Sequence, residues 1–196
     1  MKIILLILII ILSGCKSEEQ ITDKIRKNPM ENNFFNHQRI KITETVIGEA
    51  STRIIDNGRS RVENIKIACE KISGTKLNPD ETFSFNLVTG RKNKANGYKN
   101  APVLVNGESS TGIGGGVCQV STTIFLAAKN GGLKIAEHHN HSKSVNYAPK
   151  GMDATVVYGV KDLKIKNNTN KVLYIYTWVE NEKVFAKIIE KSIDIE

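Results

Sequence analysis

The sequence lacks an apolar run long enough to cross a membrane as a helix. Its longest such run has ten residues, Ile3 to Leu12, whereas a membrane-spanning helix needs about 20. The run follows the positively charged Lys2, as in the apolar centre of a secretory signal peptide. Internal repeats are also absent, and no segment reads as a second domain. These features together predict an exported protein with one domain.

Long runs of basic residues are missing as well, although lysine and arginine give the chain a net charge of +8. The charges are scattered along the sequence, which is typical of a solvated surface. In an exported protein this pattern argues against nucleic acid as a partner. It favours anionic lipid and wall polymers that carry phosphate or carboxylate.

The apolar run ends in Leu12-Ser13-Gly14-Cys15, which resembles the lipobox of bacterial lipoproteins. In that class the chain is cut before the cysteine, and acyl chains on this residue tether the protein to the membrane. We therefore expect a lipoprotein signal peptide at residues 1–14 and a lipid anchor on Cys15 with a flexible tether to residue 38. A domain would follow over residues 39–196, anchored outside the cytoplasm. An ordinary signal peptide with an incidental cysteine is the alternative.

Cysteine is scarce, and beyond Cys15 the chain has only Cys69 and Cys118. Cys69 lies on an apolar helical stripe formed by Val62, Ile65, Ala68, Cys69 and Ile72, where a free cysteine behaves as a small buried hydrophobe. Cys118 lies in no such stripe. A disulfide between the two is the alternative, since the compartment can be oxidising.

The patterns predict an α+β fold with early helices and a mainly antiparallel sheet late in the chain. Ser60 and Glu63 have the spacing of a capping box at a helix start, and Gly74 would end that helix. A second helix is expected at 118–130, ended by glycines. The expected strands are 39–47, 82–86, 101–108, 133–147, 153–160 and 163–167, with a hairpin of 171–179 and 183–190.

Four glycines precede Cys118 in "GIGGGVCQV", directly before the second predicted helix. A thiol in the first turn of a helix is stabilised as thiolate by the helix dipole. Glycines let the chain bend and approach a substrate closely. Free N–H groups at the helix start, near Gly116 and Gln119, could then hold a developing oxyanion.

A nucleophilic thiol needs a base, and three histidines cluster in "EHHNHS" as His138, His139 and His141. On a strand, His139 and His141 would face one side and His138 the other. Asp153, at the next predicted strand, is the best candidate to orient the imidazole. The order of cysteine, histidine and acid is that of papain-like peptidases, so a papain-like layout is one reading of the fold.

Other interpretations of the same residues stay open. The glycine run could cradle a phosphate, but it lacks the lysine and hydroxyl of a P-loop. Cys118 with two histidines could bind zinc, although about 20 residues separate the thiol from the histidine cluster. All of these residues could be purely structural, and Asp153 could be a turn or cap residue.

Several motifs occur in order that resemble the VanW family. They include "NPDETFSFN", "GIGGGVCQVSTT", the His141-Ser142 pair, "PKGMDATV" and "DLKIKNNT", and the likeness covers roughly residues 59–176. One departure is "HSKSVNYAPK", since many members have proline after the histidine-serine pair. This departure concerns a local loop.

The resemblance implies a wall enzyme linked to vancomycin resistance. Some VanW domains are regarded as cysteine L,D-transpeptidases that form 3→3 peptidoglycan cross-links through a thioester. Carried over, Cys118 is the nucleophile, His141 is preferred to His139 as base, and Asp153 is the family's aspartate. The partners would be peptidoglycan stem peptides, with no cofactor and no metal. A binding module without turnover and a cysteine hydrolase of stem peptides are the alternatives.

Overall fold

The computed structural model describes residues 40–105 and 108–195. The predicted signal peptide, the lipid anchor at Cys15 and the tether to residue 38 lie outside the described residues. Most of the described chain, Glu44–Lys191, forms one compact unit. The ends of the first and last strands, 40–43 and 192–195, belong to a separate unit.

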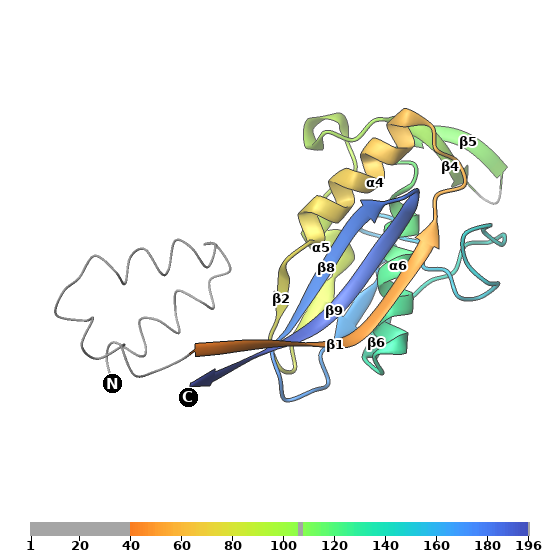
Figure 1. The fold of residues 1–196 in the computed structure, drawn as a ribbon. Helices are drawn as coiled ribbons and strands as arrows, with labels where there is room; N and C mark the ends of the chain where they lie inside the picture. The colour runs from red at the N-terminus through yellow and green to blue at the C-terminus, as the bar shows by residue number, and fades with distance from the viewer. Residues whose placement is uncertain (1–39, 106–107, 196) are drawn as a thin grey trace, which may run out of the picture. The chain divides into compact units, whose positions relative to one another are not determined.

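Three antiparallel sheets make up the strand part of the fold (Figure 1). The largest has four strands in the order β1 (Ile40–Arg53), β9 (Lys183–Ile195), β8 (Leu173–Glu180) and β2 (Thr75–Leu77). The second has the order β3 (Thr82–Ser84), β7 (Lys164–Lys166) and β6 (Lys134–Glu137). The third pairs β4 (Asn100–Val105) with β5 (Glu108–Ile113).

Helices α4 (Arg59–Ile72), α5 (Phe85–Thr89) and α6 (Val117–Asn130) pack with these sheets. A 3₁₀ turn, η1, spans Lys94–Asn96. Helix α4 lies against strand β8 and also contacts α6, α5 and β4. The α+β class and the antiparallel sheet are confirmed, while the papain-like layout stays a prediction. No helix in the described part of the chain is both long and apolar enough to span a membrane.

The two long helices bury the faces that the sequence predicts. On α4, Ile65, Ala68, Cys69 and Ile72 are buried, and Gly74 follows with φ +87°, as expected of a glycine that ends a helix. On α6, the predicted core positions Val120, Ile124 and Ala127 are fully buried. Helices α4 and α6 contact each other, and Ile65 of α4 lies against Gly116, the N-cap of α6.

The C-terminal hairpin also forms as predicted. Strands β8 and β9 pair in antiparallel register from Leu173 opposite Glu190 to Glu180 opposite Lys183. Its turn places Asn181 and Glu182 at positive φ. Strand β1 is present and extends beyond the predicted end at Ile47. Strands β4 and β5 pair, and residues 106–107 between them lie outside the described residues.

The predicted capping box at Ser60 and Glu63 is wrong. Helix α4 starts two residues earlier, with Gly58 as its N-cap and no side-chain cap bond. The Glu63 carboxylate is instead held by Arg59 and Lys99. Two cations therefore draw Glu63 away from the backbone N–H groups that a capping box would satisfy.

Two predicted strands are largely irregular in the structure. The segment 133–147 forms a strand only over Lys134–Glu137, so the three histidines lie in a loop. The segment 153–160 makes only an isolated bridge, Val157 with Lys161. Side-chain hydrogen bonds take the place of a β-ladder in this segment. The Ala154 carbonyl accepts a bond from Ser121 Oγ at 2.6 Å, and the Ala154 N–H donates to Thr122 Oγ1 at 2.9 Å.

Residues 82–86 were expected to form one strand, but the strand ends at Ser84. Helix α5 begins at Phe85, capped by the Ser84 hydroxyl, which accepts from the Leu87 N–H. Asp162 stabilises this change from strand to helix, since its carboxylate accepts hydrogen bonds from Ser84 Oγ and the Asn86 N–H. The alternation of Phe83 and Phe85 therefore does not mark one face of a strand.

Candidate active site

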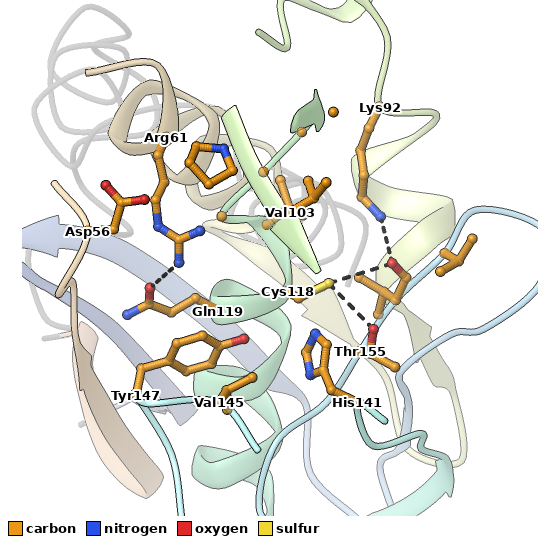
Figure 2. Close-up of a pocket in the computed structure, with 18 of the residues that line it drawn as sticks. Asp56, Arg61, Lys92, Val103, Cys118, Gln119, His141, Val145, Tyr147 and Thr155 are labelled. Carbon is orange, nitrogen blue, oxygen red and sulfur yellow. Dashed lines mark hydrogen bonds between the residues drawn. The ribbon is translucent and has the colours of Figure 1, made fainter. Parts of the chain in front are cut away.

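Cys118 is the second residue of helix α6, in its first turn. The preceding Gly116 caps the helix with φ +103°, a backbone conformation that favours glycine. The sulfur is partly exposed and lines a pocket of about 900 Å³ (Figure 2). Its polar neighbours are Thr155 Oγ1 and the Val156 carbonyl oxygen, each 3.7 Å away. The predicted position of the thiol at a helix tip is confirmed.

His141 and Asp153 lie together beside Cys118. Asp153 Oδ2 is 2.6 Å from His141 Nδ1 and 2.8 Å from the His141 main-chain N. The other carboxylate oxygen accepts a bond from Asn140 Nδ2 at 3.1 Å. With Nδ1 bound to Asp153, the free nitrogen of the ring is Nε2, and Figure 2 shows the ring close to the sulfur. Cysteine, histidine and aspartate thus form one contiguous set.

The charges in this set favour a thiolate beside an imidazolium. Burial alone would raise the pKa of Cys118, but its interaction with His141 and the positive charge of Lys92 lower the pKa to about 7. Burial opposes charge on His141, but the thiolate and Asp153 outweigh it and raise the pKa of the imidazole. The pKa of Asp153 is lowered, since the N–H donors of His141 and the Asn140 amide outweigh its burial.

The other two clustered histidines point elsewhere. His138 stacks on Phe125, with ring centroids 4.1 Å apart, and its Nε2 is 2.7 Å from the Asp153 carbonyl oxygen. His139 Nε2 is 3.0 Å from Glu137 Oε1. The expectation that His139 and His141 share a strand face is wrong, because the strand ends at Glu137. His141 is the histidine that the structure brings to the thiol.

The predicted oxyanion donors need one correction. The Gln119 N–H is occupied, because it donates to the Gly116 carbonyl at 3.0 Å. The Gln119 side chain is also fully engaged, with its amide N bound to Thr52 Oγ1 and the Arg53 carbonyl. Among the described residues, no acceptor is found for the N–H groups of Gly116 and Cys118. The free donors beside the sulfur are therefore those of Gly116 and Cys118.

Cys69 and Cys118 are both free, so the alternative of a disulfide is not realised. Cys69 is buried, and burial raises the pKa of its thiol to about 12. Its predicted role as a core residue is confirmed. Within residues 40–105 and 108–195, no group of three or more histidine, cysteine or acidic side chains could hold a metal ion.

Two pocket cations were missed by the sequence reasoning. Lys92 donates from Nζ to the Val156 carbonyl oxygen at 3.4 Å, and Arg61 donates from Nη2 to Gln119 Oε1 at 3.1 Å. Burial lowers the pKa of Lys92, and the negative charges of Cys118 and Asp162 only partly offset that effect. The sequence offered no spacing that would link these residues to Cys118, which lies 26 or more positions later.

Comparison with known proteins gives a family match. The sequence model of the family described as VanW like protein matches residues 60–189, a span that contains the whole cysteine, histidine and aspartate set. No solved structure matches the chain.

Two curated relatives cover about two thirds of the chain. The "Uncharacterized protein YoaR" of Bacillus subtilis (strain 168) is 41% identical over 134 residues, which are 68% of this chain and 44% of YoaR. The "Vancomycin B-type resistance protein VanW" of Enterococcus faecalis (strain ATCC 700802 / V583) is 31% identical over 134 residues, 66% of this chain and 49% of that protein. The chain thus spans about half the length of each relative.

Proposed function

The chain belongs to the VanW family, and from that premise we propose that it is a cysteine acyltransferase that acts on peptidoglycan stem peptides. The family is linked to vancomycin resistance. The finer proposal is an L,D-transpeptidase that forms 3→3 cross-links through a thioester. The protein would work outside the cytoplasm, tethered to the membrane by lipid on Cys15.

One observation carries this proposal: Cys118, His141 and Asp153 form a contiguous set, of which Cys118 and His141 line an open pocket. A thiolate with a pKa of about 7 is a strong nucleophile at neutral pH. An imidazole oriented by a carboxylate can give and take protons at one fixed position. Acyl transfer needs both abilities at the same carbonyl carbon, and this arrangement supplies them.

The first half of the reaction forms the thioester. The Cys118 sulfur attacks the carbonyl carbon of the diamino-acid residue in a stem tetrapeptide, and an S–C bond forms. The C–N bond to the terminal D-alanine breaks, and protonated His141 gives its Nε2 proton to the departing amine. The N–H groups of Gly116 and Cys118, which have no backbone acceptor, would stabilise the tetrahedral oxyanion.

The second half transfers the acyl group. The side-chain amine of another stem attacks the thioester carbon, and neutral His141 takes the proton that this amine loses. A C–N bond forms, the S–C bond breaks, and Cys118 leaves as thiolate beside a protonated His141. The starting charges are therefore restored. Water in place of the amine would give hydrolysis, so exclusion of water favours transfer.

The test is to incubate the full chain with a synthetic stem tetrapeptide and to look by mass spectrometry for an acyl adduct. We expect an adduct on Cys118 whose mass is that of the peptide without its terminal D-alanine, and none in Cys118→Ala. Cys69→Ala is the matched control, since Cys69 is buried away from the pocket, and it should retain the adduct.

The products then separate the alternatives. Addition of an amine-bearing stem peptide should give a 3→3 dimer. A trimmed tripeptide without dimer would point to a hydrolase. Absence of any adduct, with binding to wall sacculi retained in both wild type and Cys118→Ala, would overturn the proposal and leave a wall-peptide-binding module.

A further inference from the structure

Two cations flank the reactive sulfur, and the mechanism above assigns neither of them a contact with the substrate. Figure 2 shows Lys92 on one side of Cys118 and Arg61 on the other, both in the wall of the pocket. Within the described residues, neither forms an ion pair. Lys92 is balanced by the Cys118 thiolate alone, and cations that no carboxylate compensates are costly to bury beside a reaction centre unless a ligand also uses them.

Lys92 is fixed beside the sulfur. Its Nζ lies 3.4 Å from the same Val156 carbonyl oxygen that is 3.7 Å from Cys118 Sγ, so the ammonium and the sulfur are neighbours across that oxygen. The aliphatic stem of Lys92 lies over Gly114, where an added Cβ would come within 2.9 Å of Lys92 Cβ. A glycine at this position therefore makes room for the lysine.

Arg61 is held from the opposite side. Its Nη2 donates to Gln119 Oε1 at 3.1 Å, and the buried Gln119 amide is itself locked by Thr52 and Arg53. Arg61 Nε is buried without a hydrogen-bond partner. Because Gln119 is a neutral acceptor, the guanidinium is oriented while its charge is not compensated.

The pocket as a whole is suited to an acid. Its cationic side chains are Arg61, Arg91 and Lys92, and Asp56 is the one aspartate or glutamate that lines it among the described residues. Asp56 accepts a hydrogen bond from the Gly58 N–H and makes no ion pair with Arg61. Such a pocket attracts ligands that carry carboxylates.

The position of Lys92 matches one particular carboxylate. In a peptide that loses its last residue, the free carboxylate carbon is three bonds from the attacked carbon, within about 4 Å. The sulfur must approach that attacked carbon to about 3–3.5 Å. A cation next to the sulfur can therefore reach the carboxylate of the departing residue, whereas Arg61, beyond Gln119, is placed for a second acidic group.

We propose that Lys92 and Arg61 bind two carboxylates of one acidic peptide, Lys92 the free carboxylate of the residue that leaves and Arg61 a carboxylate on the acyl side. Lys92 then acts as a specificity-determining residue that restricts the site to the last peptide bond of its substrate. The assignment of Lys92 to the leaving residue and of Arg61 to the acyl side rests on the proposed function. The binding of a carboxylate by Lys92 does not.

The first experiment compares two alkylating reagents of similar shape, iodoacetate and neutral iodoacetamide. In both, the Cys118 thiolate displaces iodide and forms an S–C bond, but only iodoacetate carries a carboxylate. Rates are measured on the full chain at pH 8, where Cys118, with a pKa of about 7, is mostly thiolate, and peptide mass mapping separates the cysteines. Lys92→Met should lower the iodoacetate-to-iodoacetamide rate ratio about tenfold, while Lys94→Met, in the same loop and outside the pocket, should not change it.

The ratio distinguishes ligand binding from an effect on the thiol. If Lys92 only stabilises the thiolate, Lys92→Met will change both rates by the same factor and leave the ratio unchanged, which would overturn the inference. High salt should lower the wild-type ratio toward that of Lys92→Met, because it screens the attraction of the carboxylate.

The second experiment tests the proposed contacts of Lys92 and Arg61 with the two carboxylates of the peptide. It uses Cys118→Ala, which lacks the nucleophile and therefore cannot convert the peptide. The probes are a stem tetrapeptide with a free C-terminal carboxylate and the same peptide with that end amidated, and binding is measured by calorimetry. Amidation should weaken binding about tenfold, and adding Lys92→Met should abolish this difference. Arg61→Met should weaken both peptides equally.

The outcomes separate this inference from the proposed function. A preference for the free carboxylate that depends on Lys92 supports the inference even if wild type forms no acyl adduct. An acyl adduct with no such preference, or a preference that depends on Arg61 instead, overturns the inference and leaves the proposed function intact. Failure of Cys118→Ala to bind either peptide also overturns it.

Discussion

Asp153 binds His141 twice through a single oxygen. Oδ2 accepts the His141 main-chain N–H at 2.8 Å and contacts ring Nδ1 at 2.6 Å. The first bond fixes the loop that carries the histidine, and the second fixes the orientation of the ring and its tautomer. Both side chains are nearly buried, with exposed fractions of 10% for His141 and 4% for Asp153. The Asp153 carboxylate therefore determines both the position of the His141 ring and which of its nitrogens faces the Cys118 sulfur.

The first prediction concerns Asp153→Asn. The amide keeps the shape of the carboxylate but removes the charge that stabilises the imidazolium, so the rate of acyl-adduct formation should fall by on the order of 10²- to 10⁴-fold. The alkylation midpoint of Cys118 should also move to higher pH, because a less basic His141 stabilises the thiolate less. Mass spectrometry measures both the rate of adduct formation and the extent of alkylation, and the alkylation is followed as a function of pH.

Asp56→Asn is the matched control for this change. Asp56 lines the same pocket but bonds only the Gly58 N–H in the described chain. Asp56→Asn should keep the rate of adduct formation within about twofold of wild type and should leave the pH midpoint of Cys118 alkylation unchanged. An equal loss in both variants would mean that negative charge in the pocket, and not the orientation of His141, supports the reaction.

The second prediction is the pH dependence of thiol reactivity. With a pKa of about 7, the Cys118 thiol loses its proton as pH rises, so the iodoacetamide rate should rise through a midpoint near pH 7 and then level off. An ordinary cysteine has its midpoint near 8.5. Rates from pH 5 to 10, resolved for each cysteine, measure this directly.

Cys69 supplies an internal control in the same molecule. Burial raises the pKa of its thiol to about 12, so Cys69 should stay unreactive across the whole range while the protein is folded. A midpoint above pH 8 for Cys118 would contradict the charge arrangement described for the site.

Local rules predicted the parts of the fold in which the hydrophobic pattern and the chain neighbours decide the structure. The apolar stripe around Cys69, the helix from the glycine run to Asn130 and the hairpin at the C-terminus all follow from periodicity and turn residues. These elements form as expected. Periodicity failed for residues 138–160, where the backbone bonds to side chains such as Asp153 and Thr122 in place of a ladder.

The site was predictable to a similar extent. Cys118, His141 and Asp153 were identified from residue type, glycine context and family motifs, and the structure brings them together. Lys92 and Arg61 were not identified, because their link to Cys118 depends on how α4 and the loop after α5 pack around the glycine run. Such packing across distant parts of the chain leaves no local signature in the sequence.

The third prediction concerns Asn64, which ties α4 to the glycine run. This fully buried side chain donates from Nδ2 to the carbonyls of Lys99 and Gly115, at 2.9 and 3.0 Å, and accepts from the Lys99 N–H at 2.8 Å. Asn64→Ala leaves these backbone groups unpaired inside the protein. We expect a loss of about 2–4 kcal/mol in the free energy of unfolding, measured by urea denaturation.

Asn130→Ala provides the comparison for Asn64. Its side chain also bonds a backbone carbonyl, that of Glu49 at 2.9 Å, but the residue is exposed, so water can replace the bond. The loss should stay below about 1 kcal/mol. Similar losses in the two variants would show that Asn64 does not fix the glycine run through its buried bonds.

The fourth prediction separates the two histidines that the sequence left as candidate bases. His141→Gln removes the ring beside Cys118, so acyl-adduct formation should fall by on the order of 10²-fold or more. His139→Gln should form the acyl adduct at a rate within about threefold of wild type, because His139 contacts Glu137 and not the sulfur. The adduct rate on Cys118 is measured for both variants, and matching thermal unfolding temperatures confirm that both are folded. A larger loss in His139→Gln than in His141→Gln would contradict the assignment, since it would place the working base on the histidine that points away from the thiol.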